Sequence, residues 1–240
     1  MIEEPEWTRD PFLEHCLERP VYRLREPAAA SRAIVAARTS REWMIEARVS
    51  VEQVATLAAL TALGFLIIDT NIQLDCRRDS LAGTSPRAGT WSVRASRPAD
   101  RHAVERIAAH QLTASRFHLD PRIGGHLAAR VKREWVGNFF EGRRGERLLV
   151  VDTDAGVRGF LLVLEREALG VIDLVALEPD VRGSGAAAAL VESWRTGSPQ
   201  LERFLVGTQI SNVRSLRAYA KLGFRVCAAA HVLHKHAGDA

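Results

Sequence analysis

The sequence predicts an α/β protein built on a mixed central sheet. Stretches with strand character alternate with stretches of helical periodicity from residue 91 onward, and Pro, Asp and Gly separate them. The chain has 240 residues, of which 47% are hydrophobic, which is enough for a well-formed core. The expected order is strand, helix, helix, three strands, helix, strand, helix, strand, and this order is typical of a mixed α/β sheet.

The individual elements follow from local patterns. "TWSVRASR" alternates as a strand does, and Pro98 with Asp100 opens a helix in "PADRHAVERIAAHQL". "RLLVVD" and "VRGFLLVLE" flank "TDAG", which predicts a hairpin. The other expected elements are helices at 125–140, from the glycine stretch to about Trp194, and at 212–223, and strands at 170–178, 203–210 and 224–234.

The chain is expected to divide at a linker. Residues 79–90, "DSLAGTSPRAGT", are rich in Gly, Ser, Thr and Pro and separate residues 1–78 from residues 91–240. Residues 56–65, "TLAALTALGF", match 215–224, "SLRAYAKLGF", at several positions, and an apolar strand follows both. The N-terminal part is therefore either a partial copy of the later unit or a common helix–strand connection with Gly at the helix end.

Composition excludes several classes of protein. Lys and Arg number 33 against 29 Asp and Glu, without basic blocks, so no nucleic-acid partner is expected. The three cysteines are few and far apart, which argues against disulfides and a zinc site, and no metal is expected. The N-terminus lacks a secretory pattern, and the longest apolar run, Val54 to Ile68, is short for a bilayer. We expect a cytoplasmic protein without a membrane partner.

The stretch "LEPDVRGSGAAAAL" indicates a phosphate-binding loop, for which there are two interpretations. Gly183, Gly185 and Ala188 satisfy the GxGxxG/A dinucleotide pattern, and Glu202 lies where a ribose-binding acid would be expected. However, "EPDVR" separates the strand from Gly183, whereas a dinucleotide loop starts where its strand ends. A P-loop is excluded because no Gly-Lys-Ser/Thr is present.

The other interpretation is an R-x-x-G-x-A loop formed by Arg182, Gly185 and Ala187. Small residues let successive backbone N–H groups point at a diphosphate, and the N-terminus of the following helix adds partial positive charge.

Two linked motifs resemble the GNAT (GCN5-related N-acetyltransferase) superfamily over Trp91 to His234. One is "VIDLVALEPDVRGSGAAAALVESW", similar to the strand, loop and helix that hold acetyl-CoA in that family. The other is "NVRSLRAYAKLGF", similar to its N-x-x-S-x-x-x-Y-x-x-x-G-F helix, with matches at Asn212, Ser215, Tyr219, Gly223 and Phe224. The resemblance implies a GNAT-type mixed sheet with a partial, degenerate GNAT-like domain before it.

More narrowly, the chain resembles the dTDP-fucosamine acetyltransferase group, which acetylates the 4-amino group of dTDP-4-amino-4,6-dideoxygalactose. The shared stretches are "ALTALGFLIIDTNIQL", "ASRFHLDPRI" and "VGTQISN". The resemblance implies acetyl-CoA as donor and a small-molecule amine, a sugar nucleotide, as acceptor.

The resemblance also implies a set of donor-binding residues. They are Val175, Ala176, Leu177, Arg182, Gly183, Ser184, Gly185, Ala186, Ala187, Asn212 and Ser215. A strand that splays from its neighbour around Val175 to Leu177 would leave backbone N–H groups free to polarise the acetyl carbonyl.

The sequence suggests a general acid, a general base and two residues that face the acceptor, and it leaves each assignment open. Tyr219 is expected to be the general acid, because a phenol is protonated at neutral pH, although a core tyrosine is the alternative. Asp173, a carboxylate in an apolar strand, is the expected base, with Glu165 or a water chain as competitors. Arg116 and His118 are expected to face the acceptor, whereas "HVLHKH" near the C-terminus is expected to be a solvated tail.

The function predicted from the sequence is N-acetyl transfer from acetyl-CoA to a nucleotide-linked amino sugar. Another small amine, a protein N-terminus, or a non-catalytic acyl-CoA-binding module is the alternative. A homodimer is left open.

Overall fold

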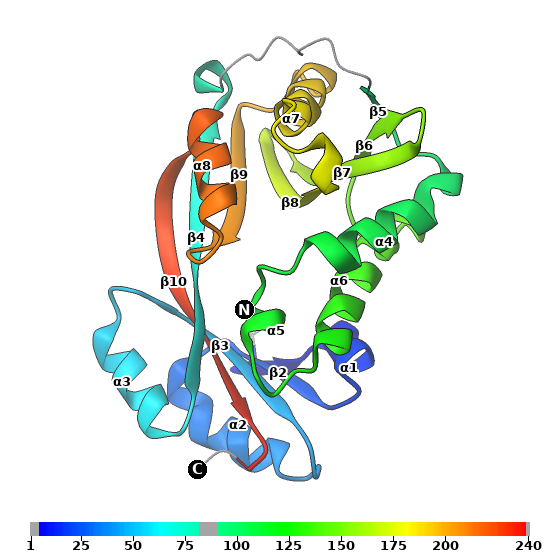
Figure 1. Cartoon of the computed structure of the whole chain (residues 1–240). Helices are drawn as coiled ribbons and strands as arrows, with labels where there is room; N and C mark the ends of the chain where they lie inside the picture. Colours follow the sequence, from blue (N-terminus) through cyan, green and yellow to red (C-terminus); the bar gives the residue numbers. More distant parts are fainter. Residues whose placement is uncertain (1–4, 82–90, 239–240) are drawn as a thin grey trace.

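The computed structural model describes residues 5–81 and 91–238, in which ten strands form one sheet (Figure 1). The strands are β1 (Trp7–Arg9), β2 (Val21–Leu24), β3 (Met44–Ser50), β4 (Leu66–Arg77), β5 (Trp91–Ala95), β6 (Arg147–Thr153), β7 (Gly156–Arg166), β8 (Leu169–Leu177), β9 (Arg203–Gln209) and β10 (Arg225–His236). Their order is β1-β2-β3-β10-β4-β9-β8-β7-β6-β5. The pairs β2–β3 and β8–β9 are parallel and the other pairs antiparallel, so the predicted mixed sheet is confirmed.

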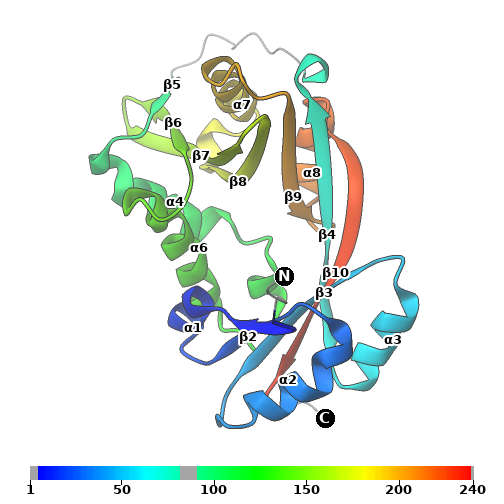
Figure 2. The ribbon, with the colours of Figure 1, turned by 180° about the vertical axis from the view of Figure 1, so that it is seen from behind.

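Helices cover both faces of this sheet. They are α1 (Pro11–Leu17), α2 (Ala30–Ala37), α3 (Val54–Ala62), α4 (Arg101–Gln111), α5 (Arg116–Leu119), α6 (Gly125–Phe140), α7 (Ala186–Gly197) and α8 (Val213–Lys221). Leu148 and Val150 of β6 pack against α4 and α6, whereas Leu149 and Val151 pack on the face of α7 and α8. This alternation follows from the twofold period of a strand. The ribbon shows α4 beside α6, across the sheet from α7 (Figure 2). None of the described helices is long and apolar enough to cross a bilayer.

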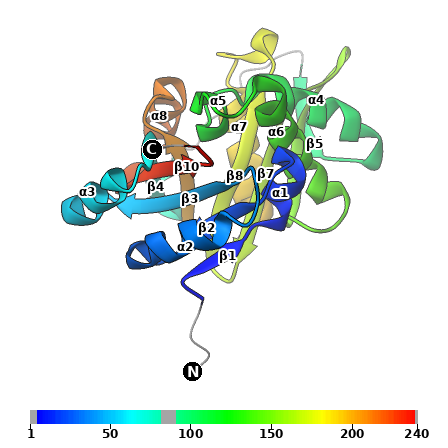
Figure 3. The ribbon, with the colours of Figure 1, turned by 90° about the horizontal axis from the view of Figure 1, so that it is seen from below.

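The N-terminal part shares the sheet with the rest of the chain. β4 lies between β9 and β10, and the C-terminal half of β10 pairs with β3 (Figures 1 and 3). The hydrogen-bonded sheet therefore continues across the expected boundary between residues 1–78 and 91–240. Most of the expected linker, residues 82–90, lies outside the described residues, and Arg78–Ser80 forms a 3-10 turn.

The two helix–strand units with matching sequences end in the same way. Phe65 N donates to Leu60 O at 3.1 Å after α3, and Phe224 N donates to Tyr219 O at 3.0 Å after α8. Gly64 and Gly223 have φ of 79° and 93°, in the left-handed region that favours glycine at a helix end. A partial copy and a common helix–strand connection both predict this cap, so it does not decide between them.

The prediction that "HVLHKH" is a solvated tail is wrong. His234 and His236 are 0% and 2% exposed, because the end of β10 lies between β3 and β4. Their rings lie 2.6 Å (Nδ1 of His234) and 2.8 Å (Nε2 of His236) from the same oxygen of Asp120. Burial raises the pKa of Asp120, but these hydrogen bonds outweigh it and hold the pKa well below its usual range.

Asp120, His234 and His236 form a cluster of side chains of the kinds that bind metal ions. Its carboxylate and two imidazoles place three ligand-type atoms within 4.8 Å of one another. Hydrogen bonding between the carboxylate and both rings accounts for this proximity, and it fastens the segment after α5 to β10. The expected absence of a metal stays a prediction.

Candidate active site

The site begins where two parallel strands separate. β8 and β9 pair from Leu169 with Arg203 to Ile172 with Val206, and no further, although the strands continue to Leu177 and Gln209. β8 remains paired with β7 along this length, and its register shifts at Asp173, which forms a β-bulge. The side of β8 that faces away from β7 is therefore open beyond Ile172, as the sequence predicts for Val175 to Leu177.

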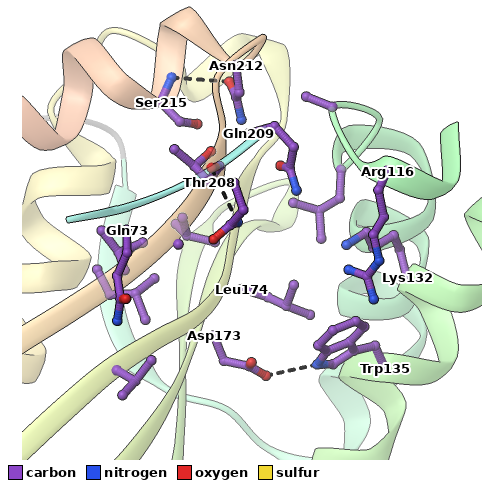
Figure 4. Close-up of a pocket in the computed structure, with 18 of the residues that line it drawn as sticks. Gln73, Arg116, Lys132, Trp135, Asp173, Leu174, Thr208, Gln209, Asn212 and Ser215 are labelled. Carbon is purple, nitrogen blue, oxygen red and sulfur yellow. Dashed lines mark hydrogen bonds between the residues drawn. The ribbon is translucent and has the colours of Figure 1, made fainter. Parts of the chain in front are cut away.

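A pocket of about 880 Å³ occupies this opening. Its walls come from β8 and β9, from α8, from α5 and α6, and from the N-terminal part of the chain (Figure 4). The N-terminal part contributes seven lining residues: Asp10, Phe12, Leu13, Arg23, Arg48, Asn71 and Gln73. The N-terminal part therefore forms one wall of the pocket.

Tyr219 lines the pocket from α8 and is 7% exposed. Its ring meets Phe224 edge-on at 5.7 Å between centroids. Burial raises the pKa of Tyr219, so its hydroxyl keeps its proton at neutral pH. This placement suits a proton donor, and the role itself stays a prediction.

The start of α8 also faces the pocket. Asn212 caps the helix by accepting a hydrogen bond from Ser215 N at 3.2 Å, and both residues line the pocket (Figure 4). The motif that resembles the family's tyrosine helix is therefore brought to one wall by the fold.

The glycine loop forms an open cradle at the start of α7. Gly183 and Gly185 have φ of 75° and 92°, and a Cβ on either would meet no atom within 4 Å. α7 begins at Ala186, so its first amides have no intrahelical acceptor. Ser184 Oγ donates to Val181 O at 2.7 Å and stabilises the turn before them. These features fit a diphosphate held by backbone N–H groups and a helix N-terminus.

Arg182 turns away from this cradle. Its Nε donates to Leu177 O at 3.0 Å and its Nη2 donates to the side chain of Gln111. The guanidinium therefore ties the loop to the end of β8 and to α4. The direct contact of Arg182 with the donor stays a prediction.

Asp173 has both carboxylate oxygens engaged. Arg144 donates to them from Nε and Nη2, each at 2.6 Å, and Trp135 Nε1 donates at 3.0 Å. Glu165, the competing candidate, accepts from Trp194 Nε1 at 2.8 Å and is not among the residues that line the pocket. Both oxygens of Asp173 therefore accept hydrogen bonds from neighbouring side chains, and its role as the base stays a prediction.

The two predicted acceptor residues are placed differently. Arg116 lines the pocket and its Nε donates to Glu46 Oε2 at 2.7 Å. Burial raises the pKa of Glu46, but Arg116 and Arg48 overcome this and lower it to about 2. His118 shares a hydrogen bond with Ser115 Oγ at 2.8 Å, and burial lowers its pKa. His118 is not among the lining residues, so only Arg116 is positioned to meet an acceptor.

Five further basic residues line the pocket although no local sequence pattern marks them as site residues. The additional cations are Arg23, Arg48, Lys132, Arg143 and Arg144. They come from four separate segments, which are β2, β3, α6 and the turn before β6, and only the folded chain brings them together.

Comparisons with known proteins place this geometry in a family. The family model described as "Acetyltransferase (GNAT) family" matches residues 104–224, which is half of the chain. A Bacillus subtilis (strain 168) protein named "Spore coat polysaccharide biosynthesis protein SpsD" is 33% identical over 132 residues, 53% of this chain and 44% of that protein. The chain therefore spans less than half the length of this curated relative.

Solved structures share the fold at low sequence identity. A tandem GNAT protein from the clavulanic acid biosynthesis pathway has a TM-score of 0.64 at 15% identity, covering 92% of this chain and 77% of its own. A GNAT protein from Sphaerobacter thermophilus has a TM-score of 0.60 at 14% identity, covering 98% of this chain and 78% of its own. With the splayed strands, the cradle and the tyrosine helix in place, the chain belongs to the Acetyltransferase (GNAT) family.

Proposed function

We propose that the protein is an N-acetyltransferase that moves the acetyl group of acetyl-CoA to the primary amine of a nucleotide-linked amino deoxysugar. The observation that carries this proposal is the pocket where β8 and β9 separate, which has Tyr219 on one wall and a cationic N-terminal wall. Acetyl-CoA supplies an acetyl group activated as a thioester.

The donor side is formed by backbone groups. The free edge of β8 around Val175 to Leu177 offers N–H groups that can polarise a carbonyl. The cradle at Gly183 and Gly185 would hold the diphosphate at the start of α7. Tyr219 would give its proton to the departing sulfur, since its hydroxyl is protonated at neutral pH.

Basic side chains outnumber acidic ones among the residues that line the pocket. Six basic side chains and two acidic ones line the pocket: Arg23, Arg48, Arg116, Lys132, Arg143 and Arg144 against Asp10 and Asp173. Guanidinium groups suit the paired oxygens of phosphates. The relative named for spore coat polysaccharide biosynthesis supports a sugar as the group that carries the amine.

The acceptor can be tested by comparing two amines. We expect acetyl transfer from acetyl-CoA to dTDP-4-amino-4,6-dideoxygalactose with a far higher kcat/KM than to the same amino sugar without the nucleotide, measured by release of the free thiol. Arg48→Gln should raise KM for the nucleotide-linked sugar, because Arg48 lines the pocket. The difference in kcat/KM between the two sugars should therefore become smaller.

Arg9→Gln is the control, since Arg9 forms an exposed ion pair with Glu14 and is not among the lining residues. Equal kcat/KM values for the two sugars would contradict a nucleotide-linked acceptor. Binding of acetyl-CoA without transfer to any amine would favour a non-catalytic acyl-CoA-binding module.

The donor site can be tested without any acceptor. CoA should raise the melting temperature of the wild type, because a ligand that binds only the native state stabilises it. Gly185→Val should abolish this rise, since the side chain would project into the open space of the cradle.

Gly156→Val is a matched control, because Gly156 has a φ of 91° against 92° for Gly185 and also has open space around it. It carries the same backbone strain in a hairpin and should keep the rise. An undiminished rise in Gly185→Val would show that the diphosphate binds elsewhere.

A further inference from the structure

One lysine lies inside the pocket under unusual conditions. Lys132 projects from α6 into the pocket, across from the bulge of β8 that carries Asp173 (Figure 4). It is only 8% exposed. Lysines are rarely buried to this extent without a partner that carries the opposite charge.

Each arginine of the pocket has such a partner. Arg23 pairs with Asp10, Arg48 and Arg116 pair with Glu46, Arg143 pairs with Glu141, and Arg144 pairs with Asp173. Within residues 5–81 and 91–238, by contrast, no oxygen accepts a hydrogen bond from Lys132.

The contacts of Lys132 are aromatic. Its Nζ lies 5.8 Å from the ring centroid of Phe117 and 5.0 Å from that of Trp135. These rings attract a cation through their π-electrons, but they carry no negative charge and accept no proton from it.

The charges that face Lys132 favour its neutral form. Burial lowers the pKa of Lys132 to about 7, and Arg116 from α5 and Arg144 from the turn before β6 act in the same direction. Asp173 from β8 opposes them, but its oxygens are already engaged by Arg144 and Trp135. His118 of α5 is also close enough for Lys132 to lower its pKa. With a pKa of about 7, a large fraction of Lys132 is therefore a neutral amine at neutral pH.

We propose that Lys132 is the general base that takes the proton from the acceptor amine during acetyl transfer. This inference rests on the proposed function, since it assigns a further catalytic residue to the same pocket. Lys132 is better suited to the role than Asp173, because no described residue donates a hydrogen bond to its nitrogen, whereas Asp173 accepts three hydrogen bonds.

Lys132, Tyr219 and water together account for every proton in the reaction. The amine nitrogen forms a bond to the acetyl carbon as the bond from that carbon to sulfur breaks, and the electron pair leaves with sulfur. One proton passes from the nitrogen to Nζ of Lys132, and Tyr219 gives a proton to the sulfur. Lys132 then releases its proton to water, and water restores that of Tyr219.

The protonation of Lys132 can be measured without an acceptor. The chain has only three lysines, so trace labelling with acetic anhydride from pH 5 to 10 can be resolved by peptide mass spectrometry. Lys132 should gain reactivity with a midpoint near pH 7, and Lys221, exposed on α8, serves as the internal reference. If the reactivity of Lys132 shows no midpoint below pH 9 and rises in parallel with that of Lys221, the proposal is overturned.

Two variants separate a base from a fixed cation. Lys132→Gln and Lys132→Arg should both lower kcat/KM for the nucleotide-linked sugar by about a hundredfold at pH 7, since neither is a base there. The loss should shrink at higher pH, where hydroxide from the solvent can take the proton in place of Lys132. A retained melting-temperature rise with CoA shows that each variant is folded.

The outcomes are distinct. Wild-type activity in Lys132→Arg with a raised KM in Lys132→Gln would make Lys132 a cation that binds the acceptor, and so contradict a base. Absence of wild-type transfer to the nucleotide-linked sugar would contradict the proposed acceptor, while the labelling would still report the state of Lys132.

Discussion

Replacing Tyr219 with Phe should lower kcat by on the order of a hundredfold or more, with the affinity for acetyl-CoA almost unchanged. The ring keeps its edge contact with Phe224 and its place in the core, so only the hydroxyl is lost. A proton donor that acts in the transition state shows its loss in both kcat and kcat/KM. Single-turnover kinetics would measure the chemical step without interference from product release.

The chain offers a matched control for this variant. Tyr22 is the other of its two tyrosines and is also buried, but it belongs to β2 and does not line the pocket. Tyr22→Phe should leave the single-turnover rate unchanged. A Tyr219→Phe enzyme that reacts as fast as the Tyr22→Phe enzyme would reduce Tyr219 to a packing residue.

Replacing Gly223 with Ala should destabilise the protein strongly, because both the backbone conformation and the space at this position exclude a side chain. Gly223 has a φ of 93°, and an added Cβ would lie 2.2 Å from the backbone oxygen of Ser80. The left-handed conformation costs an L-residue about 1–2 kcal/mol, and overpacking costs roughly 1–3 kcal/mol more. The expected loss of unfolding free energy is therefore about 2–5 kcal/mol, measured by urea unfolding.

Gly156→Ala isolates the conformational part of this cost. Its φ of 91° is nearly the same, but no atom lies within 4 Å of its added Cβ. It should lose only about 1–2 kcal/mol. Equal losses in the two variants would mean that the turn at Ser80 moves aside without cost.

Local signals were sufficient for most of the C-terminal fold. The helix expected at 125–140 and the structure agree at both ends, and the strand, glycine loop and helix around Gly185 lie where the pattern places them. Such elements depend on periodicity, caps and turn residues that are near one another in sequence. The splay of β8 from β9 and the position of Tyr219 follow from the same motifs.

Long-range contacts explain what the sequence did not reveal. Asp120 and His234 are 114 positions apart, so nothing local marks the histidines as buried. The burial of Lys132 depends on Phe117 and on the N-terminal wall, and its helix alone looks like an ordinary amphipathic one. β3 pairs with β10, which lies about 180 residues further along the chain, so this pairing leaves no local signal in the sequence.

The position of β10 between β3 and β4 also constrains how the chain acquires its structure. β4 and β10 are neighbours in the sheet but about 150 residues apart along the chain. During synthesis, β3 and β4 therefore remain without their shared partner while the whole acetyltransferase half is made. Pairing between segments so distant is slow, and unpaired strand edges recruit other chains. Newly made protein should thus pass through a stage in which aggregation competes with folding, and that stage ends only when β10 is in place.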